Sequence, residues 1–199
     1  LVAVAAFSTT ATSAALYYMV HSTFAAACLF LVADLVVTRR STDTLRAEPA
    51  TVQNGLFAAL FFAAAIAMAG MPPLSGFLGK LLVLDALREP GVIGWAWSAI
   101  LVGSLLTIVG FARAGSSLFW KSTAISVPVP GGEAASDTVP APQPPATTAQ
   151  VAPVVFALAA LAALAIFAGP VSAYLDDTAA QLFDRAAYVD AVLSPVEER

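Results

Sequence analysis

Long apolar stretches separated by short polar breaks run along most of the 199-residue chain. A helix needs about 20 apolar residues to cross the hydrocarbon core of a bilayer. Residues 1–37 carry one formal charge, that of Asp34, and are too many for a single crossing. The hydroxyl-rich segment "STTATS" (residues 8–13) therefore predicts a turn between a short helical stub and a full helix over 13–37.

The middle of the chain predicts three more helices. A polar loop over 38–54 precedes a helix over 55–69, in which Gly55, Ala59, Ala63 and Ala67 recur every four residues, a pattern that favours close approach of a neighbouring helix. The break "GMPPLSG" leads to a helix over 75–88, and "REPG" ends it. The next helix spans 92–114, with aromatic residues near both ends (Trp95, Trp97, Phe119, Trp120), as in interfacial aromatic belts.

The C-terminal part has a different composition. Residues 122–150 hold six prolines and predict a disordered loop. Residues 151–175 predict a last spanning helix, and the acidic tail over 176–199 contains "LFDRAAYVDAVL", whose spacing favours a short amphipathic helix at the membrane surface. Together these segments predict an all-α polytopic membrane bundle with five crossings, a stub and a discontinuous helix. Its domains are 1–121, the loop 122–150, the final helix 151–175 and the tail 176–199.

Composition supports a membrane protein and excludes several classes. The chain is 59% hydrophobic and 11% charged, with a mean hydropathy of +0.84. No basic cluster indicates a nucleic-acid partner, and Cys28 is alone, so we expect neither a disulfide framework nor a thiolate metal site. Nucleotide, flavin and metal-ligand motifs are absent, so we expect no cofactor and no metal, and a chain that is not itself an enzyme. Because it starts without Met or a basic segment, we interpret it as the C-terminal part of a longer protein.

Four ionisable residues fall within the predicted spans: His21, Asp34, Lys80 and Asp85. An unpaired charge at the centre of a bilayer costs about 2.5–3.5 kcal/mol even on the lenient insertion scale, so such residues usually face a protein interior or a water path. Asp34 is four residues from the polar loop and can instead reach the interface. Asp85 lies three residues before Arg88, which favours a structural ion pair.

Lys80 follows the break by about one helical turn and is surrounded by leucines. One interpretation is that its long side chain reaches the membrane interface. The other is a lysine in a dry, partly hydrated interior, where the charge is costly to keep and a proton can be loaded and released. The residues that break the helix favour the second interpretation, since freed backbone groups of transport helices line cavities. They are Gly70, Pro72, Pro73, Gly76 and Gly79.

His21 lies in the middle of "LYYMVHSTFAAACLF", on one helix face with Ala14, Tyr17, Ala25 and Cys28. A buried histidine that hydrogen-bonds across helices is one interpretation. A proton relay is the other, because imidazole titrates near neutral pH and carries protons on two nitrogens. Thr23 adds a hydroxyl beside it.

Two segments together carry a family resemblance: "YYMVHSTFAAACLFLVAD" and, about 35 residues later, "AGMPPLSGFLGKLLVL". They resemble the antiporter-like subunits of membrane proton pumps. Within that superfamily they are most similar to the D-type subunits of the multisubunit Na⁺(K⁺)/H⁺ antiporter (Mrp type). The resemblance covers residues 1–121 and extends to the L-, M- and N-type proton-pumping subunits of respiratory complex I.

The resemblance implies a place for this chain in a larger architecture. Such subunits contain two inverted five-helix repeats, each with one discontinuous helix, and this chain corresponds to most of the second repeat and the final helix. Lys80 then corresponds to the lysine on the second broken helix, and His21 to the histidine that passes protons along the polar axis. One departure concerns the lysine that many members carry four or five residues after the histidine, because Ala25 and Ala26 occupy those positions here. Water or the Thr23 hydroxyl then bridges the gap.

Three functions follow as hypotheses. The first is a subunit that exchanges protons for Na⁺ or K⁺, assembled with other membrane subunits in the lipid bilayer of the bacterial inner membrane. The second is a proton-pumping subunit of an NADH-quinone oxidoreductase or a membrane-bound hydrogenase. The third is a membrane scaffold whose polar residues only join helices.

Overall fold

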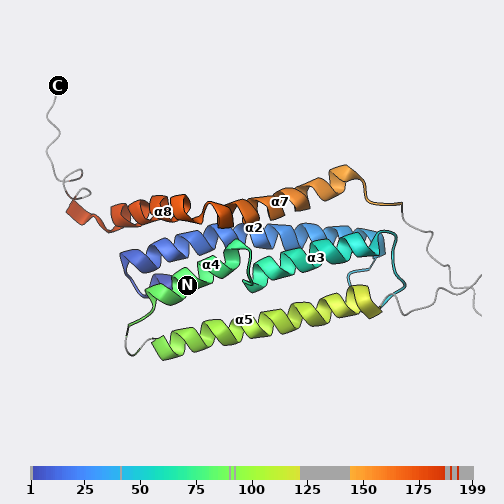
Figure 1. The fold of residues 1–199 in the computed structure, drawn as a ribbon, viewed down its shortest axis with the longest axis horizontal. Coiled ribbons are helices and arrows are strands. Elements are labelled where there is room, and N and C mark those ends of the chain that lie inside the picture. The colour runs from blue at the N-terminus through green and yellow to red at the C-terminus, as the bar shows by residue number, and fades with distance from the viewer. Residues whose placement is uncertain are drawn as a thin grey trace, which may run out of the picture.

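Helices form every regular element in the described part of the chain. The structure is a computed structural model that describes residues 2–40, 42–89, 91, 93–121, 144–186, 189 and 192. The elements are α1 (Val2–Ala5), α2 (Thr9–Arg40), α3 (Asn54–Ala69), α4 (Ser75–Ala86), α5 (Ile93–Gly115), the π-helical turn η1 (Ser116–Trp120), α7 (Thr148–Ile166) and α8 (Ala168–Phe183). Their axes share one long direction (Figure 1). The all-α membrane bundle predicted from the sequence is confirmed.

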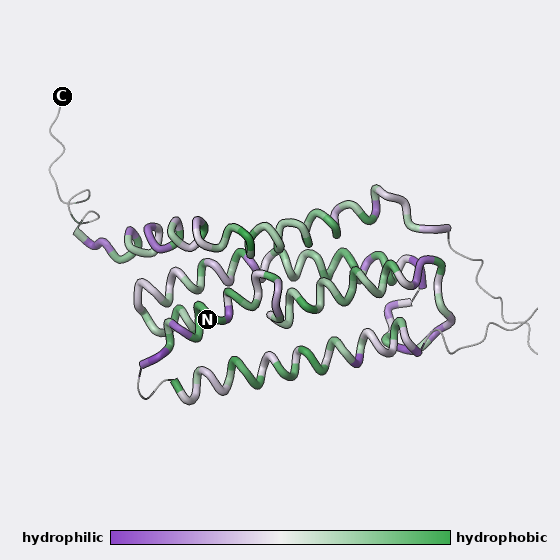
Figure 2. The backbone as a smooth tube through the Cα atoms, in the orientation of Figure 1, coloured by the Kyte–Doolittle hydropathy of each residue, from purple (hydrophilic) through white to green (hydrophobic). Residues whose placement is uncertain are grey.

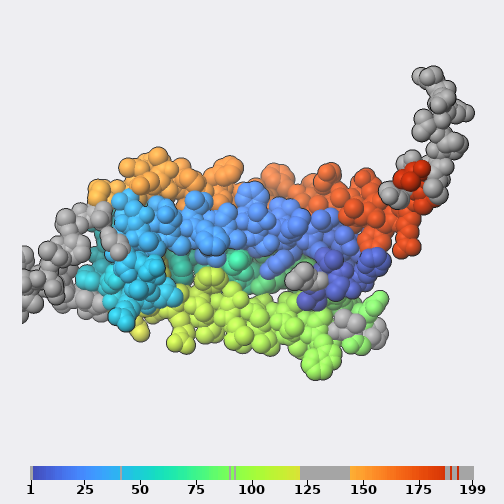
Figure 3. Space-filling view, turned by 180° about the vertical axis from the view of Figure 1, so that it is seen from behind, coloured from blue at the N-terminus to red at the C-terminus, as the bar shows by residue number. Residues whose placement is uncertain are grey.

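The unbroken helix α2 is the centre of the bundle. It packs against α3, α4, α7 and α8, and in the space-filling view it lies between α7–α8 and α5 (Figure 3). All five residues that the sequence placed on one face of this helix are buried: Ala14, Tyr17, His21, Ala25 and Cys28. The 3.6-residue period therefore identified the packed face of α2.

Helices α3 and α4 follow one another along the same line (Figure 1). α4 meets the first half of α2, where Gly79 approaches Tyr17, and α3 packs against the second half in a cluster that includes Cys28 and Val32. Alone, the 16 residues of α3 and the 12 of α4 reach only about 24 and 18 Å, less than the bilayer core of about 30 Å. The two helices that the sequence analysis counted as separate crossings are therefore the halves of one interrupted crossing.

The small-residue face predicted for α3 is not its packed face. Of those four residues only Ala67 is buried, and nothing lies within 4 Å of a Cβ built on Gly55. The packed face combines Phe57, Leu60 and Phe61 with Ala64 and Ala65 in the main core cluster. The prediction was wrong because large and small side chains pack together on this face, so the spacing of the small ones alone does not identify it.

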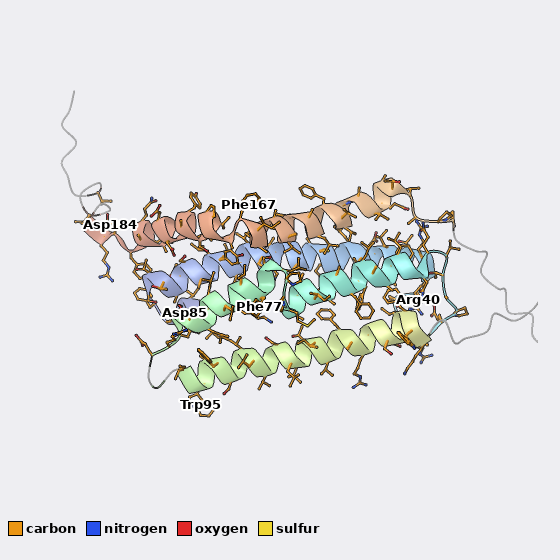
Figure 4. All side chains as sticks on the ribbon, viewed as in Figure 1. Arg40, Phe77, Asp85, Trp95, Phe167 and Asp184 are labelled. Atoms are coloured by element: carbon orange, nitrogen blue, oxygen red, sulfur yellow. The ribbon has the colours of Figure 1, made fainter. Side chains whose placement is uncertain are left out.

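The final helical segment is interrupted at Phe167, where α7 ends and α8 begins (Figure 4). The sequence analysis expected one helix over 151–175, but α8 continues past that bound to Phe183. The carbonyl of Leu164, in the last turn of α7, accepts a hydrogen bond of 3.0 Å from the Tyr17 hydroxyl of α2. This bond attaches the interruption to the central helix.

Three helical stretches are long and apolar enough to cross a membrane among the described residues: Thr9–Arg40, Ile93–Trp120 and Thr148–Ile166. Apolar residues occupy the middle of the bundle, and polar ones gather toward its ends (Figure 2). At one end, Arg39 of α2 donates a hydrogen bond of 2.5 Å to Gln150, which caps the start of α7. The predicted loop over 122–150 falls mostly on residues 122–143, outside the described residues, as does part of the predicted tail helix.

Candidate functional site

The site is built on the break between α3 and α4. α3 ends at Gly70, which has a left-handed backbone (φ 70°). Its N–H donates to the Ala67 carbonyl at 3.0 Å, and the Met71 N–H donates to the Ile66 carbonyl at 3.1 Å. This is the Schellman pattern of helix termination, which favours glycine. Pro72 and Pro73 follow, joined by a cis peptide bond, and lack the N–H groups needed to continue the helix. The carbonyl of Ala69 is left for another donor.

Lys80 is that donor. Its Nζ donates to the Ala69 carbonyl at 2.6 Å and to Ser104 Oγ on α5 at 2.8 Å. The ammonium therefore sits at the C-terminal end of α3, where the helix macrodipole is negative and favours a cation. The ion pairs of the described residues join Arg40 to Glu48 and Arg88 to Asp85. Within that part of the chain, neutral oxygens and the dipole balance the Lys80 charge, and no carboxylate does.

The half-buried Lys80 also faces a cavity of about 780 Å³ between α2, α4 and α5. The residues that line it include the hydroxyl-bearing Thr12, Tyr18, Ser22, Ser104 and Thr107 and are otherwise largely apolar. The inward interpretation of the lysine thus agrees with the geometry better than extension to the interface, because the Nζ atom is held at the break.

Ser104 was missed by the sequence analysis. Its hydroxyl donates to the Ile100 carbonyl one turn earlier, at 2.7 Å, which leaves the oxygen free to accept from Lys80. The available signal was a serine in the apolar run "LVGSLLT", where a hydroxyl needs a partner. Nothing in the sequence paired it with a residue 24 positions earlier.

His21 lies on the other side of the same break and is only 1% exposed. Its Nδ1 is 2.9 Å from Ser75 Oγ, at the first residue of α4. The backbone carbonyl of Ala67 lies on the Nε2 side of the ring. Gly76 allows this contact, because a Cβ there would lie 2.7 Å from His21 Nε2 and closer still to the Ala67 oxygen. Ser75 is the second residue that the sequence analysis missed.

The last turn of α3 joins the two titratable residues. Ala67 contacts the His21 ring and Ala69 accepts from Lys80. The structure thus brings together the two residues to which the sequence analysis gave proton transfer. Each bonds to one serine hydroxyl, and each lies beside the backbone of one alanine of this turn. Two glycines of the break lie against these residues, Gly70 against Lys80 and Gly76 against His21, and Gly79 lies against Tyr17 and Tyr18.

The secondary candidates lie elsewhere. Asp34 is exposed on α2, and Asp85 is exposed at the end of α4 away from the break (Figure 4), paired with Arg88 at 2.7 Å. Thr23 is exposed, and its hydroxyl donates to Met19 of its own helix at 2.9 Å. The hydrogen bonds and ion pairs of the described residues join none of the three to His21 or Lys80. In the described part of the chain, no three His, Cys, Asp or Glu side chains gather as a metal site would require.

Comparisons with known proteins bear on this site. The family described as "NADH:quinone oxidoreductase/Mrp antiporter, TM" matches residues 1–107. The D-type subunit of the Na(+)/H(+) antiporter of Bacillus subtilis (strain 168) is 28% identical over 182 residues, which cover 90% of this chain and 34% of that protein. The D-type subunit of a probable K(+)/H(+) antiporter of Rhizobium meliloti (strain 1021) is 26% identical, over 90% of this chain and 36% of its own length.

A solved structure agrees in fold. One chain of the Mrp complex from Dietzia sp. DQ12-45-1b superposes with a TM-score of 0.75 at 25% identity, over 96% of this chain and 41% of that one. A more distant similarity joins this chain to the N-type subunit of the NADH-quinone oxidoreductase of Desulforamulus reducens, 26% identical over 62% of this chain and 26% of that protein. The chain spans about a third of the length of the antiporter relatives.

Proposed function

Because the chain belongs to the NADH:quinone oxidoreductase/Mrp antiporter transmembrane family, we propose that it is a membrane subunit of a monovalent cation/proton antiporter that moves protons through Lys80 and His21. Its resemblance to the D-type subunits of Mrp antiporters is confirmed by the relatives and by the Mrp complex structure. The exchanged ion is Na⁺ or K⁺, the chain works with other membrane subunits, and its location is the bacterial inner membrane.

The observation that supports this proposal is that both groups lie at one broken helix. Lys80 donates to Ala69 and His21 contacts Ala67, within a single turn of α3. A lysine held by neutral oxygens keeps its charge at a cost, so a change in nearby charge can release its proton. Imidazole can receive a proton on one nitrogen and give it up from the other.

The cavity gives Lys80 a route for proton exchange with water. Lys80 and the Ser104 hydroxyl both face it, and a space of about 780 Å³ with several hydroxyls can hold water beside the ammonium. His21 is buried and does not line it. Protons therefore exchange between Lys80 and water in the cavity, while His21 carries them on the enclosed side of the break.

Replacement of Lys80 tests the proposal in everted membrane vesicles from an antiporter-deficient host that makes the whole complex. Lys80→Ala should assemble and lose cation-induced proton exchange. Lys80→Arg should lose it almost completely, since guanidinium does not release its proton in a working pH range. Lys121→Arg, at an exposed residue that follows η1, is the control and should behave as wild type. Wild-type exchange by Lys80→Arg would overturn the role of Lys80 as a proton carrier.

Replacement of His21 tests the second group in the same vesicles. His21→Ala should lower exchange strongly, and His21→Gln should keep part of the assembly because an amide retains hydrogen-bonding capacity. Wild-type exchange by His21→Ala would show that His21 does not carry protons and that Lys80 alone does.

A second candidate rests on the similarity to an N-type subunit of an NADH-quinone oxidoreductase. The same site would then pump protons while other subunits oxidise NADH. NADH dehydrogenase activity that copurifies with the complex would favour this candidate, and its absence with retained cation exchange would favour the antiporter.

A further inference from the structure

We propose that Ser75 is a positioning residue for His21, whose hydroxyl holds the imidazole ring in place in both of its protonation states. The inference rests on the proposed function, because it concerns how the histidine of that site keeps its orientation while it gains and loses a proton.

The contact between Ser75 and His21 is enclosed. Ser75 is 0% exposed and His21 is 1% exposed, and their Oγ and Nδ1 atoms are 2.9 Å apart. The two residues are 54 positions apart in sequence, on α4 and α2. A hydrogen bond inside such a dry site is stronger than the same bond in water, and its loss leaves a buried polar atom without a partner.

The Ser75 hydroxyl does not cap its own helix. Ser75 is the first residue of α4, after the N-cap residue Leu74, and no side chain caps the start of this helix. The Ser75 hydroxyl bonds to His21. The hydroxyl therefore bonds to the imidazole and does not cap α4.

The second nitrogen of the ring fixes the direction of the first bond. Nε2 lies on the side of the Ala67 carbonyl, because a Cβ on Gly76 would be 2.7 Å from Nε2 and closer still to the Ala67 oxygen. A carbonyl only accepts, so a neutral ring can bond it only through a hydrogen on Nε2. In that tautomer Nδ1 accepts from Ser75.

Protonation reverses only the bond to Ser75. A proton added to Nδ1 turns this nitrogen into a donor, and the serine hydroxyl rotates so that its oxygen accepts. The bond to Ala67 is unchanged. A hydroxyl satisfies the ring in both states, whereas a methyl group satisfies it in neither. With Ser75 present, His21 can therefore keep the same side-chain conformation at the break when it gains or loses a proton.

The other groups near the ring do not replace this function. Tyr18 lies on the same helix, with its ring centroid 5.7 Å from that of His21, and Lys80 acts on the ring through its charge from α4. The hydrogen bonds of Lys80 go to Ala69 and Ser104 and not to the imidazole. Among the ion pairs of the described residues, no carboxylate faces His21. Among the described residues, the hydrogen bond to Ser75 is therefore the contact that orients the ring.

Substitution at Ser75 tests the inference in the assembled complex, with exchange rate, apparent KM for the cation and the pH profile of the rate measured in everted vesicles. Ser75→Ala should assemble normally, keep the KM and lower the maximal rate about tenfold, with an altered pH profile. Ser75→Thr, which retains the hydroxyl, should restore much of the rate and the wild-type profile. Ser13→Ala is the matched control, since Ser13 is also buried on α2 but lies about 12 Å along the helix from His21.

Two further variants keep the test decisive. If Ser75→Ala does not assemble, Ser75→Cys preserves the volume with a much weaker hydrogen-bonding group, and a lowered rate supports the inference while a wild-type rate overturns it. The double variant His21→Gln/Ser75→Ala should be no slower than His21→Gln alone, and multiplied losses would overturn it. A wild-type rate and profile for Ser75→Ala, in vesicles where His21→Ala loses exchange, contradicts only the role of Ser75. Wild-type exchange by both His21→Ala and Lys80→Ala contradicts the proposed function instead.

Discussion

The side chain of Lys80 lies directly against the backbone of Gly70. A Cβ on Gly70 would come within 2.7 Å of the lysine Cδ and Cε atoms and 2.9 Å of Nζ. Gly70 thus has two functions at the break. Its left-handed backbone ends α3, and its missing side chain leaves the space through which the lysine reaches the Ala69 carbonyl.

Gly70→Ala should therefore lower exchange much more than it lowers the amount of complex. The alanine Cβ displaces the Lys80 side chain, and the positive φ adds strain of about 1 kcal/mol. Exchange and subunit content in vesicles measure the two effects. Gly94→Ala, at a helical glycine with nothing within 4 Å of its Cβ position, should leave both unchanged. Wild-type exchange by Gly70→Ala would show that the lysine does not need this position.

Ser104→Ala should reduce exchange about tenfold or more, because a hydrogen bond to a charged group contributes roughly 1.5–3 kcal/mol. The loss should appear in the exchange rate while the complex assembles. Thr107→Val is the control on the next turn of α5, since Thr107 lines the same cavity but its hydroxyl donates to Gly103 of its own helix. An equal loss in both variants would indicate that the cavity lining matters and the lysine contact does not.

Tyr17→Phe should destabilise the packing of α7 and α8 against α2. The substitution leaves the Leu164 carbonyl without the tyrosine donor, which costs about 1–3 kcal/mol if no water replaces it. The thermal midpoint of the purified complex should fall, while Tyr174→Phe, at a tyrosine that is 71% exposed, should have no effect. Equal midpoints for the two variants would contradict a stabilising role for the bond.

Asp34→Asn and Asp85→Asn should leave measurable exchange. Both carboxylates are exposed and lie outside the hydrogen bonds of His21 and Lys80. The Asp85–Arg88 pair is more than half exposed on both sides, and such surface pairs contribute about 0–1 kcal/mol. Altered assembly or an altered pH optimum is compatible with this expectation. Complete loss of exchange with normal protein levels would refute it.

Local patterns in the sequence predicted most of the helices and the burial of His21. The 3.6-residue period identified the buried face that contains Tyr17 and His21, and the composition of "GMPPLSGFLGK" predicted a break beside Lys80. Each of these depends on neighbours within a few turns of the same helix. The prediction of the packed face of α3 was wrong, because large and small residues are buried together on that face and the spacing of the small ones does not show which side meets α2.

The hydrogen-bond partners of His21 and Lys80 could not be predicted from the sequence. Ser75 and Ser104 lie 54 and 24 positions from the groups that they contact, and any of several serines in the spans had similar composition around it. The end-to-end arrangement of α3 and α4 was missed for the same reason. Hydropathy counts apolar residues along the chain, whereas the path of the interrupted crossing follows from its contacts with α2.

The length of α2 also fixes where His21 lies relative to the membrane potential. Its 32 residues extend about 48 Å, well beyond a hydrocarbon core of about 30 Å. With the helix centred in the bilayer, His21 is about 5 Å from the midplane. A proton that reaches it from either surface has then crossed roughly half of the transmembrane voltage, which amounts to about 1 kcal/mol for each 100 mV. If His21 carries protons as proposed, its occupancy by a proton should respond to voltage as well as to the pH on either side.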